Sequence, residues 1–250
     1  MSVEGNKRPF HLLRKFWGIF AVIAIAFGLS GCGESSDQTD KPETSVETGG
    51  EKTGEGKDAK AEKEVEEEET VEIPYIEPHA LSGSGDTVTD AIDLQPGFIV
   101  LDANHSGSRN FIVKLYDPNG NPTELMINHI GNYNGKTFAL IEQTGSYRFE
   151  ITADGNWDLI VDQNIPEDPE TGPVSGKGDD VRFIKLEPGS YVVNGSHDGE
   201  RNFIVKVNGK NLLFNEIGSY EGSKIQGVKD SGIYAVSVKA DGNWTIEFTE

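Results

Sequence analysis

The sequence is poor in cysteine and in basic residues. Among its 250 residues there is one cysteine, Cys32, so no intramolecular disulfide is possible and the folded parts depend on their hydrophobic cores. Only 22 Lys and Arg stand against 42 Asp and Glu, which gives a net charge of -20 at pH 7. The sequence contains no basic stripe, and this balance argues against binding to nucleic acid or to an anionic lipid surface.

Sequence motifs of the common catalytic sites are absent too. There is no Gly-x-Ser-x-Gly, no His-Glu-x-x-His and no glycine-rich loop of the kind that holds phosphates. Carboxylates are numerous, but their pattern places them on the surface, and nothing marks a pair with separated pKa values. We therefore expect a protein that is not an enzyme. The alternative is a hydrolase whose acid and base are brought together only in space.

The sequence also lacks a long hydrophobic run. Its longest one, Phe16 to Leu29, is shorter than the ~20 residues that a helix needs to span a bilayer. Four basic residues precede it: Lys7, Arg8, Arg14 and Lys15. This order is typical of a signal peptide. We expect residues 1–31 to be such a peptide, the alternative being an uncleaved anchor.

The hydrophobic run ends in Leu29-Ser-Gly-Cys32. This tetrapeptide resembles the lipobox of bacterial lipoproteins, in which the cysteine thiol is acylated and becomes the first residue of the mature chain. The resemblance implies a lipid anchor on Cys32 and a position outside the cytoplasm on a bacterial membrane. An anchor with two or more acyl chains would hold the protein there stably.

Residues 32–79 are expected to form a disordered, acidic linker. Up to Ile73 they contain almost no aromatic or branched apolar side chains, so they cannot bury enough surface to offset the entropy of ordering. The alternative is a helix over 57–72, which the run Glu66 to Glu69 disfavours because the like charges repel one another. A coil of this length reaches ~35 Å, so the linker would hold the folded part away from the membrane.

The rest of the chain is a duplication. Arg109-Asn-Phe-Ile-Val-Lys114 recurs without change as Arg201 to Lys206. Further matches keep the same order in both copies: Ser82-Gly-Ser-Gly-Asp86 and Ser175-Gly-Lys-Gly-Asp179, Leu94-Gln-Pro-Gly97 and Leu186-Glu-Pro-Gly189, His105 and His197, Tyr133 and Tyr220, and Ala153-Asp-Gly-Asn-Trp157 and Ala240 to Trp244. We expect a first repeat at 80–163, a proline-rich spacer at 164–173 and a second repeat at 174–250.

Both repeats read as short strands separated by turns. In the first repeat strands are expected near 87–94, 98–103, 110–116, 124–128, 136–141, 147–152 and 157–161. Seven short strands without helical periodicity predict an all-β fold, with two tandem antiparallel β-sandwiches of the jelly-roll or immunoglobulin-like kind. Period-two alternation places Trp157 in step with Leu159, and Trp244 in step with Ile246, so both tryptophans are expected in the cores.

The candidate ligand-binding residues are the duplicated tyrosines and histidines. Tyr133 and Tyr220 lie between glycines in a presumed loop, where a ring can contact a ligand or fold over its own loop. His105 and His197 follow the inward alternation of their strands. Each could bind a metal or act as a base, but a single histidine without a paired ligand spacing is more often a hydrogen-bonded residue that closes the end of a sandwich.

Aspartates offer a weaker candidate for calcium. Asp86 and Asp179 recur in Gly-x-Gly-Asp, and Asp154 and Asp241 recur beside a glycine. None of the four lies in a run like Asp-x-Asn-x-Asp-Gly, so calcium is a possible cofactor and no other cofactor is expected.

With these motifs in view, each repeat resembles an uncharacterised repeat of secreted and membrane-anchored bacterial proteins. The shared pattern includes Gly-x-Gly-Asp, Leu-x-Pro-Gly, His-x-Gly, Asn-Phe-x-Val and Ala-Asp-Gly-x-Trp. More loosely, Leu115-Tyr-Asp-Pro-Asn-Gly120 and Gly145-Ser-Tyr147 are similar to the pre-peptidase C-terminal type of β-sandwich, whereas the second repeat lacks Leu-Tyr-Asp-Pro. The resemblance implies an accessory module without catalytic residues.

The expected function is therefore non-catalytic binding at a bacterial cell surface. The partner would be a glycan or a protein of the envelope, and two tandem modules would add avidity. The alternative is a structural spacer or shield whose recurring residues only maintain the fold.

Overall fold

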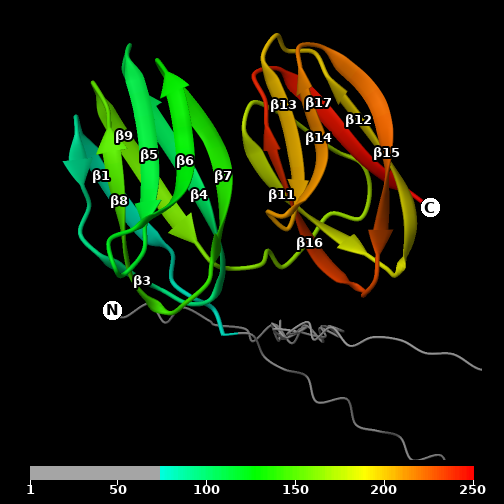
Figure 1. Cartoon of the computed structure of the whole chain (residues 1–250), viewed down its shortest axis with the longest axis horizontal. Helices are drawn as coiled ribbons and strands as arrows, with labels where there is room; N and C mark the ends of the chain where they lie inside the picture. The colour runs from blue at the N-terminus through cyan, green and yellow to red at the C-terminus, as the bar shows by residue number, and fades with distance from the viewer. Residues whose placement is uncertain (1–73) are drawn as a thin grey trace, which may run out of the picture. The chain divides into compact units, whose positions relative to one another are not determined.

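The computed structural model describes residues 74–250. The predicted signal peptide, the lipidation of Cys32 and the linker up to residue 73 lie outside these residues. The described part consists of β-strands, turns and irregular segments, without an α-helix (Figure 1), and so it holds no helix that could cross a membrane. The all-β prediction is confirmed.

The first repeat contains nine strands. They are β1 (His79–Ser84), β2 (Thr87–Val88), β3 (Ile92–Leu94), β4 (Gly97–Ser106), β5 (Asn110–Tyr116), β6 (Pro122–Ile130), β7 (Tyr133–Ile141), β8 (Gly145–Thr152) and β9 (Asn156–Asp162). One sheet has the order β1-β9-β4-β7, the other has the order β2-β8-β5-β6 with β3 also paired to β8, and all the pairs are antiparallel.

The second repeat follows the same plan with eight strands. They are β10 (Val174–Lys177), β11 (Asp180–Leu186), β12 (Gly189–His197), β13 (Asn202–Val207), β14 (Asn211–Ile217), β15 (Tyr220–Val228), β16 (Gly232–Lys239) and β17 (Asn243–Thr249). Its sheets have the orders β10-β17-β12-β15 and β11-β16-β13-β14.

The repeats differ where β11 corresponds to two strands, β2 and β3. Between these two strands the buried Thr89 bonds to Phe149 twice: its N–H donates to the Phe149 carbonyl and its hydroxyl accepts the Phe149 N–H. The sequence predicted one continuous strand over 87–94. This prediction was wrong because the hydroxyl of Thr89 accepts the Phe149 N–H and so replaces the regular backbone pairing along this edge.

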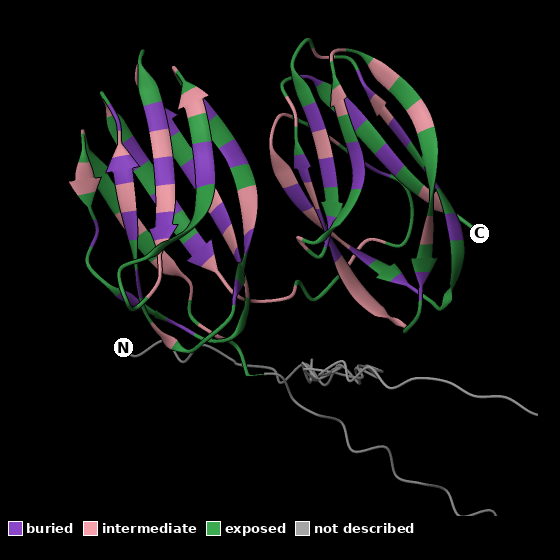
Figure 2. Cartoon of the chain, viewed as in Figure 1, coloured by how far each residue is buried: buried purple, intermediate pink, exposed green. Residues whose placement is uncertain are grey.

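Each repeat has its own hydrophobic core between its two sheets, and the alternation of side chains along the strands explains it. Along β4 the inward residues are Ile99, Leu101, Ala103 and His105, and along β5 they are Phe111, Val113 and Leu115. Figure 2 shows this alternation as bands of buried and exposed residues along each strand. Since β-branched and aromatic side chains fit a pleated surface with one buried face, these segments form strands.

Both tryptophans lie in the cores, as the alternation predicted. Trp157 is 3% exposed and Trp244 is 2% exposed. Each indole N–H donates to the carbonyl of a glycine with positive φ, Gly85 at 3.1 Å and Gly178 at 2.9 Å. The rings also lie against Gly83 and Gly176, where a Cβ would be 2.4 Å from the indole. Each tryptophan therefore packs against the recurring Ser-Gly-x-Gly-Asp segment of its own repeat.

Candidate functional site

Most of the recurring motifs of each repeat, Leu-x-Pro-Gly excepted, come together at one end of its sandwich. In the first repeat this end is formed by the turns after β1, β4, β6 and β8, and in the second by the turns after β10, β12, β14 and β16 (Figure 1). We call these two groups of turns the motif ends. The opposite ends carry the turns that differ in length, 117–121 in the first repeat and 208–210 in the second.

A carboxylate holds the turn after β4 in place. Asp154 accepts the backbone N–H groups of Ser108, at 3.0 Å, and of Arg109, at 3.1 Å, and also the hydroxyl of Ser108. In the second repeat Asp241 accepts the N–H groups of Glu200 and Arg201 in the same way. Two segments far apart in the sequence are thereby joined at each motif end. Asp154 and Asp241, two of the four aspartates that the sequence suggested for calcium, thus accept backbone N–H groups in this structure.

These hydrogen bonds lower the pKa of the Asp154 carboxyl because they stabilise its ionised form. The N–H of Ser108, followed by that of Arg109, holds the pKa of Asp154 down at about 2. An ionised Asp154 therefore stabilises the folded state fully above the pKa of an unfolded aspartate, ~3.9, and this contribution is lost as the pH falls towards 2.

We expect the Asp154→Asn variant to lose less stability than the wild type on acidification from about pH 5 to about pH 2. Urea unfolding of both proteins at several pH values in this window measures the difference. Because other carboxyls, such as Asp198, also have a lowered pKa, the comparison rests on the difference between the two proteins. A constant difference across the window would contradict the role of the Asp154 charge.

His105 and His197 are buried beneath these turns. Each is 3% exposed, and each ring stacks on a core phenylalanine, His105 on Phe111 with 4.4 Å between ring centroids and His197 on Phe203 with 5.0 Å. The Nδ1 atoms lie 2.8 Å and 2.9 Å from the carbonyl oxygens of Gly131 and Gly218. A carbonyl only accepts, so Nδ1 carries a proton. The imidazoles thus join the turn after β6 or β14 to the strand end.

The second ring nitrogen differs between the repeats. Nε2 of His197 accepts the N–H of Gly242 at 3.2 Å and lies 3.3 Å from the Asp241 carboxylate. Nε2 of His105 lies 3.6 Å from Asp154 and has no hydrogen-bond partner in the described chain. Both rings lie below the surface, so the surrounding turns, rather than the imidazoles, face the solvent.

The tyrosines occupy strands rather than loops. Tyr133 and Tyr220 are the first residues of β7 and β15, each paired with the histidine of the neighbouring strand. Their placement in a loop was therefore wrong: the flanking glycines Gly131 and Gly218 adopt positive φ and end the turn just before the strand begins. Tyr133 is 8% exposed and packs against Phe111, whereas Tyr220 is half-buried.

Asp86 and Asp179 shape the turns in which they lie. Their Oδ1 atoms accept the N–H groups of Ala153, at 2.9 Å, and Ala240, at 3.0 Å. Within residues 74–250 no cluster of three or more histidine, cysteine or acidic side chains is placed to hold a metal ion. Calcium binding stays a prediction from the sequence alone.

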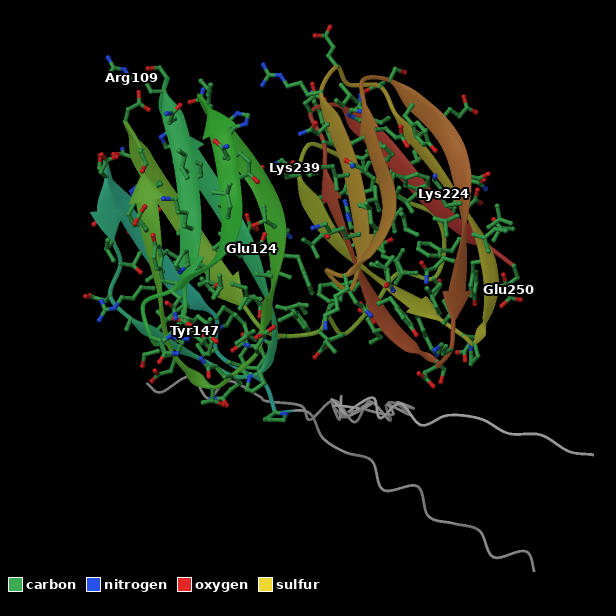
Figure 3. All side chains as sticks on the ribbon, viewed as in Figure 1. Arg109, Glu124, Tyr147, Lys224, Lys239 and Glu250 are labelled. Atoms are coloured by element: carbon green, nitrogen blue, oxygen red, sulfur yellow. The ribbon has the colours of Figure 1, made fainter. Side chains whose placement is uncertain are left out.

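Two exposed positions, an arginine and an isoleucine, recur at the motif ends although their side chains are not part of either hydrophobic core. Arg109 extends into solvent from the end of its repeat (Figure 3), and the side chains of Arg109 and Arg201 have no hydrogen bond or ion pair within 74–250. Beside them Ile130 and Ile217 are exposed, each on the strand that pairs with the recurring hexapeptide. The repetition of Arg109 and Ile130 in the second copy, as Arg201 and Ile217, was the sequence signal that could have identified them.

A concave surface lies on the outer face of one sheet of the second repeat. It has a volume of about 570 Å³ and extends over β10, β17, β12 and β15. Its lining is mostly polar, with the hydroxyls of Ser175, Ser196, Ser219, Tyr220 and Thr245, the amide of Asn243 and the charged groups of Lys177, Asp198 and Glu221. Half-buried Tyr220 lies at one side of it. This volume falls within the range of small-ligand sites, about 300–1,000 Å³.

No protein-family model matches this chain, and neither does any of the curated proteins.

Proposed function

We propose that this chain is a lipid-anchored, non-catalytic protein of the bacterial cell surface whose β-sandwich repeats bind a glycan or a protein of the envelope. The observation that carries the proposal is the hydroxyl-lined concavity of the second repeat, next to Tyr220. Hydroxyl and amide groups on a rigid sheet can exchange hydrogen bonds with a polar ligand, and a half-buried tyrosine adds an apolar face with a polar tip.

The four residues that the sequence suggested for ligand binding have different roles in this proposal. His105, His197 and Tyr133 are buried and support the motif ends from beneath, so in this proposal they position the turns. Direct contact with the ligand falls to Tyr220 and to the exposed groups on the sheet, such as Thr245 and Ser196, whose hydroxyls are 2.6 Å apart.

The test is retention of residues 74–250 on purified bacterial envelope material. Thr245 is exposed, and a long side chain there fills the concavity without entering the core. We expect both Thr245→Arg and Thr245→Glu to lower the retained fraction at least about tenfold, which corresponds to about 1.4 kcal/mol of binding free energy. Because the two variants introduce opposite charges, a loss of retention that both share results from filling the concavity rather than from the change in charge.

The matched control is Asp158→Arg, at the corresponding position of β9 in the first repeat, which should leave retention unchanged. Equal retention of both Thr245 variants and the wild type would reject binding at this concavity.

The second candidate is a structural spacer, and the buried network supports it. The recurring His105, Asp154 and Tyr133 all contact other groups of the protein itself, as expected of residues that maintain a fold. If the wild type shows no retention on envelope material in the experiment above, the spacer becomes the better account.

A further inference from the structure

The two equivalent tyrosines differ in the partner of their hydroxyl groups. Tyr133 donates its O–H to Oδ2 of Asp179 at 2.9 Å. The hydroxyl of Tyr220 has no hydrogen-bond partner within residues 74–250. This hydroxyl is therefore free to donate to another molecule, and a tyrosine hydroxyl usually has such a partner where it is buried.

The partner of Tyr133 is a turn that lies against an edge strand. Asp179 follows Gly178, whose φ is 75°, and its Oδ1 is fixed by the N–H of Ala240. The backbone carbonyl of Asp179 accepts the N–H of Lys136 on β7 at 3.0 Å. A Cβ on Gly135 would lie 2.8 Å from that carbonyl, so the strand needs a glycine where the turn approaches.

Three features of β7 therefore contact the turn: the hydroxyl of Tyr133, the absence of a side chain at Gly135, and the backbone N–H of Lys136. We call this set of three residues the receiver. Since β7 is the last strand of the sheet β1-β9-β4-β7, its outward N–H groups have no neighbouring strand to bond to. Burial by this contact also raises the pKa of Tyr133 far above its ordinary value, with the Asp179 charge adding to the effect.

The second repeat carries the same receiver on β15. Tyr220, Gly222 and Ser223 take the positions of Tyr133, Gly135 and Lys136, and β15 is the last strand of the sheet β10-β17-β12-β15. In both repeats the tyrosine hydroxyl lies over the glycine two residues later. No described segment of the chain bonds to the outer edge of β15.

The first repeat carries the same turn. Gly85 has a φ of 71°, close to the 75° of Gly178, and Oδ1 of Asp86 accepts the N–H of Ala153 as Oδ1 of Asp179 accepts that of Ala240. Oδ2 of Asp86 has no partner in the described residues, and the side chain is exposed. The turn is thus already held in the shape that the first receiver binds.

We infer that the receiver of the second repeat, Tyr220, Gly222 and Ser223, binds the Gly85-Asp86 turn of a second copy of this chain. The Tyr220 hydroxyl would donate to Oδ2 of Asp86, and the N–H of Ser223 would donate to the Asp86 carbonyl. Turn and receiver lie on different repeats, so the contact is head-to-tail. The receiver of the second copy stays free in such a contact. It can bind the Gly85-Asp86 turn of a third copy, so the same contact can repeat along a row of molecules.

The contact between copies is expected to be weaker than the contact within one chain. A short connection between two parts raises their effective concentration to about the millimolar range. A second copy has no such connection. Anchoring on a membrane would supply the high local concentration instead, whereas an envelope ligand is not needed for this association.

Cross-linking of two single-cysteine proteins tests the inference. Both proteins contain residues 32–250 with Cys32→Ser, so that every described residue is present. One carries Ser84→Cys beside the turn and the other carries Ser223→Cys at the receiver, both at exposed positions. After mixing and treatment with a short bis-maleimide, we expect a mixed dimer in at least several-fold higher yield than either protein forms alone.

Two further variants identify the atoms involved. Tyr220→Phe in the Ser223→Cys protein removes only a hydroxyl without an internal partner, and Asp86→Asn in the Ser84→Cys protein replaces the free acceptor oxygen. We expect each change to reduce the mixed dimer to the yield of the single proteins. Tyr133→Phe, which affects only the contact within the chain, should leave the yield unchanged.

A mixed dimer no more abundant than the self-linked products would overturn the inference. So would a yield that Tyr220→Phe does not change, because the hydroxyl is central to the proposed contact. Neither result would bear on retention by envelope material, which the Thr245 variants measure separately.

Discussion

Phe111→Ala is expected to lower the free energy of unfolding by about 3–5 kcal/mol, the usual cost of removing a buried phenylalanine side chain. Phe111 is fully buried and lies in the centre of the recurring hexapeptide. One face of its ring stacks on His105, and the ring of Tyr133 packs against it at 5.7 Å between centroids. The substitution therefore opens a cavity under the motif end as well as in the core. Urea unfolding followed by tryptophan fluorescence measures the change.

The matched control for Phe111→Ala is Ile130→Ala at the same motif end. Ile130 is 69% exposed, so its removal should change stability by no more than about 0.5 kcal/mol. Phe203→Ala in the second repeat should resemble Phe111→Ala, because Phe203 is also fully buried and stacks on His197. A loss below about 1 kcal/mol for both phenylalanines would mean that the cores are far more adaptable than their packing indicates.

Gly155→Ala is expected to destabilise the first repeat by about 1–3 kcal/mol or more, as overpacking does. A Cβ on Gly155 would lie 1.8 Å from the carbonyl oxygen of Ser106 and 2.8 Å from its carbonyl carbon. Both are backbone atoms at the end of β4, so relief requires the turn after β8 to move. That movement would also displace Asp154 from the amides of Ser108 and Arg109. Thermal unfolding and amide hydrogen exchange in the turn after β4 would detect it.

Gly227→Ala provides the control for added volume. No heavy atom lies within 4 Å of a Cβ at Gly227, and its φ is not in the left-handed region. This variant should unfold within about 0.5 kcal/mol of the wild type. If Gly155→Ala behaves like Gly227→Ala, the close approach of the turns after β4 and β8 is not part of the folded state in solution.

The sequence was sufficient to predict which side chains of a single strand point into the core. The alternation around Trp157 and Trp244 predicted their burial, and the inward alternation of His105 and His197 predicted rings at the end of the sandwich. These predictions succeeded because the side chains of a strand alternate between its two faces, whatever strand lies next to it.

Residues beside glycines were harder to place. Tyr133 and Tyr220 were assigned to a loop because glycines flank them on both sides. One of those glycines ends the turn with a positive φ, whereas the other, Gly135 or Gly222, lies inside the strand beneath the tyrosine hydroxyl. Two glycines that are four residues apart thus have different purposes in each repeat, and the presence of glycine alone does not distinguish a turn from a close contact.

The duplicated motifs and their period-two alternation were sufficient to predict an all-β fold built twice along the chain. The partners of the motif residues required the tertiary structure. Asp154 reaches the amides of Ser108 and Arg109, and Asp179 reaches Tyr133, only because turns from distant strands meet at particular sheet edges. Alternation is a local property of each strand, whereas these meetings depend on strand order and register, which short identical motifs do not specify.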